Sequence, residues 1–455
     1  MEQGDGAIRD ALAYQERARE IADQSGVQSQ STNIARAAVI GAGTMGTGIA
    51  LALSRAGIRT LLIDKDTAAL ARAKARIESD THNAIGKGRI GAAEGDMAME
   101  CMSYGDAIET IGPIDLAIEA AFEQLSVKRA IMVELDRHCP PSAILGTNTS
   151  TLDLDAIAHA TSRPEKVIGL HFFSPAHIMP LIEIVRGAKT DDAIIAAAIG
   201  LSRRLNKAGI VVGNCYGFAG NRMVEGMGRE VNRLLLEGNA PVDIDAAIRT
   251  FGMAMGPLEV ADLVGIDIPY QARQENPQAL PSDNAYYRMA DKLVELGRLG
   301  QKTGRGYYQY EKGIRGGQVD PEVGEIAASE AARLGVEQTL STAEEVVERC
   351  ILPLINEGAR ILEEGIASRA SDLDLIYTLG YGFPAERGGP MYYADRLGMD
   401  HVRNRLNALR AQYGDYWVTA PLIERLADEH SSFADYDRQN GPRKDADKNQ
   451  KGLGV

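Results

Sequence analysis

Short apolar runs alternate with longer amphipathic stretches along the first half of the chain. "AAVI", "TLLID" and "DLAIEA" are typical of buried strands, and the stretches between them have the 3.6-residue spacing of helices, an alternation that continues to "GIVVG" near Gly213. Strands that follow one another through helices are joined by right-handed crossovers and lie parallel. The pattern predicts an α/β domain of Rossmann-like type with a mostly parallel, doubly wound sheet.

After Gly217 the pattern becomes helical and contains an internal similarity. A string Gly-Pro-x4-Asp-x-x-Gly-x-Asp begins at Gly256 and occurs again from Gly389. Recurrence of Asp and Gly at helix ends would explain single matches, but a shared string of this length indicates duplication of one helical unit. We therefore expect an all-α C-terminal region of two related repeats. The predicted division is an N-terminal helix and linker (1–34), the Rossmann-like domain (35–214), a first helical domain (215–314), a second helical repeat (315–430) and a polar tail expected to fray (431–455).

Composition narrows the classes of partner and the compartment. The net charge of −14 and the pI near 5.1 disfavour a general nucleic-acid or anionic-membrane surface. The four cysteines form neither a zinc-ligand cluster nor a disulfide framework. The first thirty residues lack an apolar leader, and Gly452-Leu453-Gly454-Val455 is not a Ser-Lys-Leu address. We expect a cytoplasmic protein with no bound metal and no membrane span.

A glycine-rich turn follows the first predicted strand. Gly41-x-Gly43-x-x-Gly46 would allow a tight turn, close approach of a pyrophosphate and close packing of helix on strand, and the helix N-terminus would attract the phosphates. A glycine turn that merely packs is the structural alternative. Asp64, at the end of the second strand, would bind ribose hydroxyls and favours NAD over NADP or FAD. The predicted cofactor-binding residues of this region are Gly41, Gly43, Thr44, Met45, Gly46 and Asp64.

The segment "GLHFFSPAHIMPLIEIV" places ionisable groups among apolar ones. A hairpin through "SPAHIMP" would bring Glu183 beside His171, where a carboxylate fixes the tautomer of a histidine base. His171 could then remove the proton of an alcohol while hydride leaves carbon. Two simpler interpretations remain, namely that the histidines are structural and that Glu183 pairs with Arg186. His177 is the weaker catalytic candidate.

Five motifs together resemble the L-3-hydroxyacyl-CoA dehydrogenase family. They are "IGAGTMGTGIA", "EAAFEQLSVK", "TNTSTL", "HFFSPAHIMPLIEIV" and "GNCYGFAGNRM". The two helical repeats, with "GRLGQKTGRGYYQY" and "GYGFPAERGGPMYYADRLG", are most similar to the dehydrogenase part of fatty-acid multifunctional enzymes. About 34 residues precede the Rossmann-like domain, too few for the enoyl-CoA hydratase/isomerase region that those enzymes carry in front.

The resemblance implies roles for individual residues. It makes His171 the catalytic base and Glu183 its partner, and it makes Ser150 and Asn221 donors to the substrate oxygens. Ser174 stands where many members have Asn, which bears on substrate positioning more than on chemistry. Residues implied near the nicotinamide and its ribose are Glu123, Lys128 and Asn148. The alternatives are that Ser150 and Thr149 cap a helix near Leu152 and that Asn221 merely begins a helix.

The implied activity is NAD-dependent, reversible oxidation of L-3-hydroxyacyl-CoA to 3-ketoacyl-CoA, as in fatty-acid β-oxidation. One alternative is another hydroxyacid or carnitine-type dehydrogenase on the same scaffold. Another is a non-catalytic NAD-binding subunit that scaffolds a separate hydratase or thiolase. The predicted partners are an acyl-CoA substrate and a separate enoyl-CoA hydratase or thiolase, and duplication favours a pseudo-dimeric monomer over a homodimer. The amphipathic helix from Ile8 to Gln24 either docks on the protein or a partner or is a surface helix without a partner.

Overall fold

The computed structural model describes residues 5–24, 34–275, 283–311 and 313–440. They form two compact units. One unit, the Rossmann unit, comprises residues 9–219, 361–380 and the chain from 431 on. The other, the helical unit, comprises the chain up to residue 8 together with residues 220–360 and 381–430.

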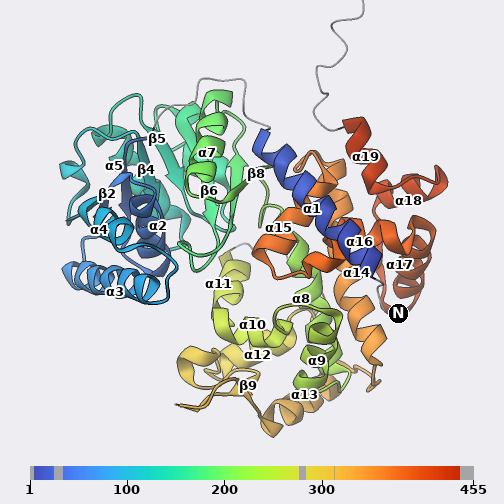
Figure 1. The fold of residues 1–455 in the computed structure, drawn as a ribbon. Helices are drawn as coiled ribbons and strands as arrows, with labels where there is room; N and C mark the ends of the chain where they lie inside the picture. Colours follow the sequence, from blue (N-terminus) through green and yellow to red (C-terminus); the bar gives the residue numbers. More distant parts are fainter. Residues whose placement is uncertain (1–4, 25–33, 276–282, 312, 441–455) are drawn as a thin grey trace, which may run out of the picture. The chain divides into compact units, whose positions relative to one another are not determined.

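The Rossmann unit is built on an eight-stranded sheet of order β3-β2-β1-β4-β5-β6-β7-β8 (Figure 1). All neighbouring strands are parallel except β6 and β7, which are antiparallel. The predicted Rossmann-like α/β fold is therefore confirmed. The strands are β1 Arg36–Ile40, β2 Arg59–Ile63, β3 Met102–Gly105, β4 Leu116–Glu119, β5 Ile144–Thr147, β6 Val167–Phe172, β7 Leu181–Arg186 and β8 Ala208–Gly213.

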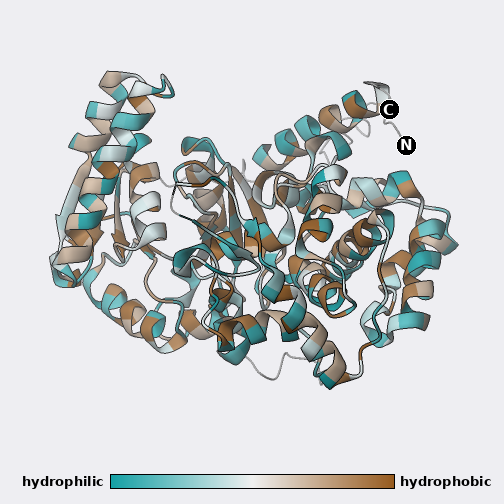
Figure 2. Cartoon of the chain, turned by 90° about the horizontal axis from the view of Figure 1, so that it is seen from below, coloured by the Kyte–Doolittle hydropathy of each residue, from teal (hydrophilic) through white to brown (hydrophobic). Residues whose placement is uncertain are grey.

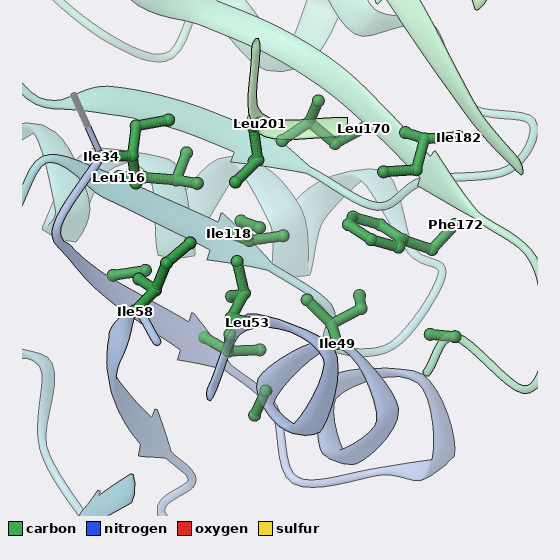
Figure 3. Packing of buried hydrophobic residues seen from close by; sticks show 14 of the residues in the cluster. Ile34, Ile49, Leu53, Ile58, Leu116, Ile118, Leu170, Phe172, Ile182 and Leu201 are labelled. Atoms are coloured by element: carbon green, nitrogen blue, oxygen red, sulfur yellow. The ribbon is translucent and has the colours of Figure 1, made fainter. Parts of the chain in front are cut away.

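Helices cover this sheet because nearly every residue of its central strands β1, β4, β5 and β6 is buried and most are apolar. Figure 3 shows Ile49 and Leu53 of one covering helix, α2, packed near Ile118 of β4, within a core that also contains Leu170 and Phe172 of β6. The helices of the Rossmann unit between β1 and β8 are α2 Thr44–Arg55, α3 Thr67–Gly86, α4 Ala92–Glu100, α5 Leu125–His138, α6 Leu154–Ala158 and α7 Asp192–Arg204.

The strand order reverses at β1, which lies between β2 and β4. In parallel α/β sheets a ligand binds in the crevice beyond the carboxyl ends of the strands at such a switch point. The ends of β1, β4, β5 and β6 are therefore where a site is expected.

The helical unit follows the predicted helical pattern. Hydrophobic residues (brown in Figure 2) alternate with hydrophilic ones along the helices, as amphipathic packing requires. No described helix combines the length and apolarity needed to cross a membrane. The elements after β8 are α8 Gly220–Leu236, α9 Pro241–Phe251, α10 Pro257–Val264, α11 Asp267–Glu275, α12 Arg288–Glu295, β9 Tyr308–Gln309, β10 Gln318–Val319, α13 Pro321–Leu334, α14 Ala343–Glu363, α15 Ala370–Gly380, α16 Pro390–Leu397, α17 Met399–Tyr413, α18 Pro421–Asp428 and α19 Phe433–Asn440.

Each repeat contains a buried aspartate that accepts a hydrogen bond from a tyrosine. In the first repeat, Oδ2 of Asp245 accepts from the Tyr308 hydroxyl at 2.6 Å, and burial raises the pKa of Asp245 to about 6. The corresponding Asp374 of α15 accepts from the hydroxyl of Tyr14, which lies in the N-terminal helix α1 (Asp5–Gln24), at 2.7 Å. The first tyrosine comes from the same repeat, whereas the second comes from the far end of the chain.

A second bond fastens α1 to α15, because the Thr378 hydroxyl donates to Oε1 of Gln15 at 2.8 Å. Ala11, Ala18 and Ala22 are buried along one helix face, and Figure 1 shows the helix (blue) beside α15. The helix is therefore not a surface helix without a partner, because it packs on the second repeat. The predicted linker at 25–33 lies outside the described residues.

The expectation of a frayed tail from 431 is wrong for residues 433–440, which form α19. The reason is that a polar residue of this segment, Asp437, caps another helix, which the composition alone does not reveal. The Asp437 carboxylate accepts from the amides of Ala370 and Ser371 at the start of α15, and Phe433 is buried. Residues 441–455 lie outside the described part.

We predict that Tyr14→Phe lowers the free energy of unfolding by about 1–3 kcal/mol, because it removes a donor from a buried carboxylate. Urea unfolding would measure the change. Tyr270→Phe is a suitable control, since no described residue makes a hydrogen bond with that hydroxyl and little change is expected. Equal stability of the two variants would contradict a stabilising role for the contact between α1 and α15.

Candidate active site

The three glycines of the turn after β1 lie in different surroundings. Gly41 has φ +107°, and a Cβ on it would lie 2.7 Å from the carbonyl oxygen of Ala120 in the loop after β4. A Cβ on Gly46 would lie 1.8 Å from the carbonyl oxygen of Gly41. A Cβ on Gly43 would meet no protein atom within 4 Å. Gly41 and Gly46 are therefore required by the fold, whereas at Gly43 the backbone is bare toward open space.

The N-terminus of α2 faces the same space. The helix begins at Thr44, and its cap residue Gly43 has no side chain to bind the first amides. Thr44 and Met45 belong to this first turn, where N–H groups and the helix dipole favour an anion. A cradle of this kind fits the pyrophosphate of a dinucleotide.

Asp64, which follows β2, is oriented by the glycine turn itself. Its Oδ2 accepts from the Ala42 amide at 2.8 Å, and its Oδ1 accepts from the Asp66 amide at 2.9 Å. A carboxylate has about four acceptor positions. Asp64 is partly exposed and retains acceptor capacity for ribose hydroxyls.

His171 and Glu183 lie directly opposite each other on β6 and β7. Nδ1 of His171 lies 2.7 Å from Oε2 of Glu183, whose side chain is fully buried. Because an ionised carboxylate only accepts, Nδ1 carries the proton and Nε2 has the lone pair. The pair thus has the geometry of a general base and the group that orients it. Arg186 pairs instead with Asp192 at 2.8 Å.

Aromatic rings enclose this histidine. The ring centroids of Phe173 and Phe218 lie 4.7 and 5.9 Å from that of His171, which is itself 7% exposed. Exclusion of water strengthens the attraction between a protonated imidazole and its carboxylate. The strand end is fixed as well, since Oδ1 of Asn148 accepts from the Phe172 amide at 2.9 Å.

Glu123 binds the loop that contains Ser150. Its Oε1 accepts from the Thr149 hydroxyl at 2.6 Å, the Ser150 amide at 2.7 Å and the Ser150 hydroxyl at 3.2 Å. Burial alone would raise the pKa of Glu123, but the Lys128 ammonium and these hydrogen bonds lower it below its ordinary value. The helix that follows is capped by Asp153 rather than by Ser150. Thr149 still contributes to the turn, because its hydroxyl accepts from the Leu152 amide.

Lys128 lies deeper than a cofactor-binding role alone would require. Its side chain is 1% exposed, and Nζ lies 3.0 Å from both carboxylate oxygens of Glu119 and 3.1 Å from Oε2 of Glu123. Glu119 ends β4 and is fully buried. Sequence reasoning missed the role of Glu119, although it is the first residue of the quoted "EAAFEQLSVK" motif.

Asn221 belongs to the helical unit, in the first turn of α8. Its Oδ1 accepts from the Tyr381 hydroxyl at 2.7 Å, which orients the amide so that Nδ2 is the end that can donate. Tyr381 was also missed, although it lies in the quoted motif "GYGFPAERGGPMYYADRLG", because it is 160 positions away from Asn221 in sequence. Tyr381→Phe would remove the hydroxyl that donates to Asn221, which makes the contact testable.

His177 lies away from the His171 pair and packs beside α3. Its Nε2 is 3.9 Å from Oδ2 of Asp80, and burial, with the nearby Arg55, lowers its pKa. The lower rank of His177 among the sequence candidates stays a prediction.

Family models match both parts of the chain. The NAD-binding domain of 3-hydroxyacyl-CoA dehydrogenase matches residues 36–215. The C-terminal domain of the same family matches twice, at 217–310 and 346–433, which supports the duplication.

Curated relatives and solved structures agree with these models. The chain is 38% identical to the peroxisomal bifunctional enzyme of Danio rerio over 88% of its length and 57% of the relative's. It is 35% identical to the peroxisomal fatty acid beta-oxidation multifunctional protein of Oryza sativa, again over 88% of its length and 56% of the relative's. The chain thus spans little more than half of these relatives.

Two solved structures cover nearly the whole chain. A 3-hydroxybutyryl-CoA dehydrogenase from Escherichia coli is 28% identical with a TM-score of 0.75, covering 88% of this chain and 99% of that one. The dehydrogenase part of multifunctional enzyme 1 from C. elegans is 27% identical with a TM-score of 0.64, covering 91% and 98%.

The glycine turn offers a matched pair of variants. We predict that Gly43→Ala keeps the melting temperature but weakens dinucleotide binding about tenfold or more, because its methyl group points into open space that a pyrophosphate would use. Gly46→Ala should lower the melting temperature as well, because its Cβ collides with the Gly41 carbonyl. Thermal unfolding and NADH fluorescence titration measure the two effects. Unimpaired binding by Gly43→Ala would contradict the assignment of the cradle.

Proposed function

Because the chain belongs to the 3-hydroxyacyl-CoA dehydrogenase family, we propose that it reversibly oxidises L-3-hydroxyacyl-CoA to 3-ketoacyl-CoA with NAD. The observation that carries the proposal is the buried hydrogen bond between His171 and Glu183, at the carboxyl end of a strand in a sheet that offers a dinucleotide cradle. An alcohol oxidation needs a base at that edge, and this pair supplies one.

His171 takes the substrate hydroxyl proton on Nε2, while Nδ1 keeps its hydrogen bond to Glu183. The carboxylate stabilises the imidazolium that results and holds the ring in position. NAD, when bound, accepts the hydride from C3 of the substrate. The ring contacts of Phe173 and Phe218 keep water from the histidine during proton transfer.

Ser150 and Asn221 are proposed to donate to the substrate oxygens. Ser150 is held by its amide, whose bond to Glu123 is shorter than that of its hydroxyl, so the hydroxyl can turn toward a ligand while the backbone stays in place. Asn221 follows Phe218 by three residues, and Phe218 packs on His171, which supports a role for Asn221 in the same reaction. Thr44, Met45 and Asn148 are proposed to contact the cofactor.

The division into five segments, the partners and the compartment also remain proposals. An enoyl-CoA hydratase would supply the substrate and a thiolase would consume the product, and both are inferred as separate partners. We propose that the duplicated helical region makes the protein a pseudo-dimeric monomer rather than a homodimer. A cytoplasmic location remains a prediction from the sequence, while several relatives bear peroxisomal or glyoxysomal names.

The activity is tested by following NADH consumption with acetoacetyl-CoA. We expect His171→Ala to reduce kcat by a factor on the order of 10² to 10⁴, because it loses the general base. Ser150→Ala should reduce kcat on the order of 10² to 10³, as for a donor near developing charge. NADH binding should be kept in both variants.

The control for this experiment is His177→Ala, which changes a histidine of the adjoining loop that lies away from the pair. Its turnover should stay within a few-fold of the wild type. Near-normal turnover by His171→Ala would contradict the mechanism. A wild type that consumes no NADH with 3-ketoacyl-CoA of any chain length would contradict the proposed activity.

A further inference from the structure

The reaction described above leaves a buried ion pair without a role. Glu119 and Lys128 are 0% and 1% exposed, and both carboxylate oxygens lie 3.0 Å from Nζ. Removing two charges from water costs free energy that an apolar pair of similar volume would not incur. The cost of burying this ion pair next to the candidate active site therefore suggests that the pair has a function there.

Glu119 also joins the ends of two loops. Its Oε1 accepts from the Ala121 amide at 2.7 Å, in the loop after β4, and its Oε2 accepts from the Thr147 hydroxyl at 2.6 Å, at the end of β5. The same carboxylate thus fixes the beginning of the loop that carries Glu123 and the beginning of the loop that carries Ser150.

Lys128 continues the connection toward the reacting groups. Its ammonium lies 3.1 Å from Oε2 of Glu123, while the other oxygen of Glu123 accepts from the Ser150 amide and hydroxyl. The three charged groups form a chain, Glu119 to Lys128 to Glu123, that ends on Ser150. Glu123 is 35% exposed, whereas Glu119 and Lys128 are almost fully buried and act from behind the site.

We propose that Glu119 and Lys128 are positioning residues that hold Ser150 in its catalytic position through Glu123. The proposal rests on the proposed function for Ser150, but the arrangement itself is a property of this chain. Lys128 then acts through Glu123 rather than by touching the nicotinamide.

Three variants separate positioning from stability. Glu119→Gln leaves a buried ammonium with one carboxylate fewer, so we expect a melting temperature several degrees lower and kcat about tenfold lower or more. Lys128→Met should behave similarly. In the double variant E119Q/K128M both fully buried charges are absent and the remaining carboxylate, Glu123, is 35% exposed to water, so the melting temperature should return toward that of the wild type.

The decisive result is kcat of the double variant. Positioning requires that kcat with acetoacetyl-CoA stays about tenfold or more below the wild type although stability returns, with a smaller change in the KM for NADH. Recovery of kcat together with the melting temperature would overturn the proposal, because the pair would then be merely structural.

A matched control is Asp372→Asn, which breaks the buried ion pair between Asp372 of α15 and Arg369, the residue that precedes α15. This variant should lose stability while its kcat stays unchanged. A fall in kcat equal to that of Glu119→Gln would show that disrupting any buried ion pair reduces turnover. That result would count against a specific positioning role for Glu119 and Lys128.

Hydrogen exchange gives a readout that needs no turnover. In the double variant Glu123 still accepts from the Ser150 amide but has lost the ammonium that holds it in place. Peptides covering residues 144–152 should therefore exchange about tenfold faster, while peptides covering residues 192–204 stay unchanged. Unchanged protection at 144–152 would overturn the proposal even if the wild type had no activity with acetoacetyl-CoA. Absence of that activity alone would reject only the proposed function.

Discussion

A carboxylate without exposed surface is stable inside a protein only when donors meet it, and at Glu183 the His171 ring is such a donor. Their contact depends on one reversal of chain direction. The loop 173–180 makes β6 and β7 antiparallel in a sheet that is otherwise parallel, and the register then places the two residues opposite each other. A slip of one residue would turn Glu183 to the other face of the sheet.

The candidate site therefore has two supports of different chemistry. On one side, His171 has the geometry of a base and is oriented by the Glu183 carboxylate. On the other side, the Ser150 loop is held by a lysine between two carboxylates, and the lysine lowers the pKa of Glu123 against the effect of its partial burial. In both cases the groups that would meet a ligand are oriented by groups one layer deeper. Such a layer is what holds reacting atoms within the tolerance that catalysis requires.

How much the sequence predicted depends on how local each signal is. The glycine turn and the His171–Glu183 pair were predictable, because a strand followed by glycines and a hairpin with fixed parity are patterns within about twenty residues. Glu119 was not, because an acidic residue at a strand end is ordinarily exposed and only the position of Lys128 explains its burial. The helix α19 was missed for a similar reason. Its polar residues indicate a tail until Asp437 is seen to cap α15.

The bond between Tyr14 and Asp374 joins residues 360 positions apart in sequence. Chains are synthesised at about 5–20 residues per second, so α1 leaves the ribosome roughly 20 to 70 s before the helix on which it packs. During that interval the alanine face of α1 has no native surface to cover it. Helix α1 is thus made well before the surface that buries it, and it stays exposed to solvent until the second repeat has emerged.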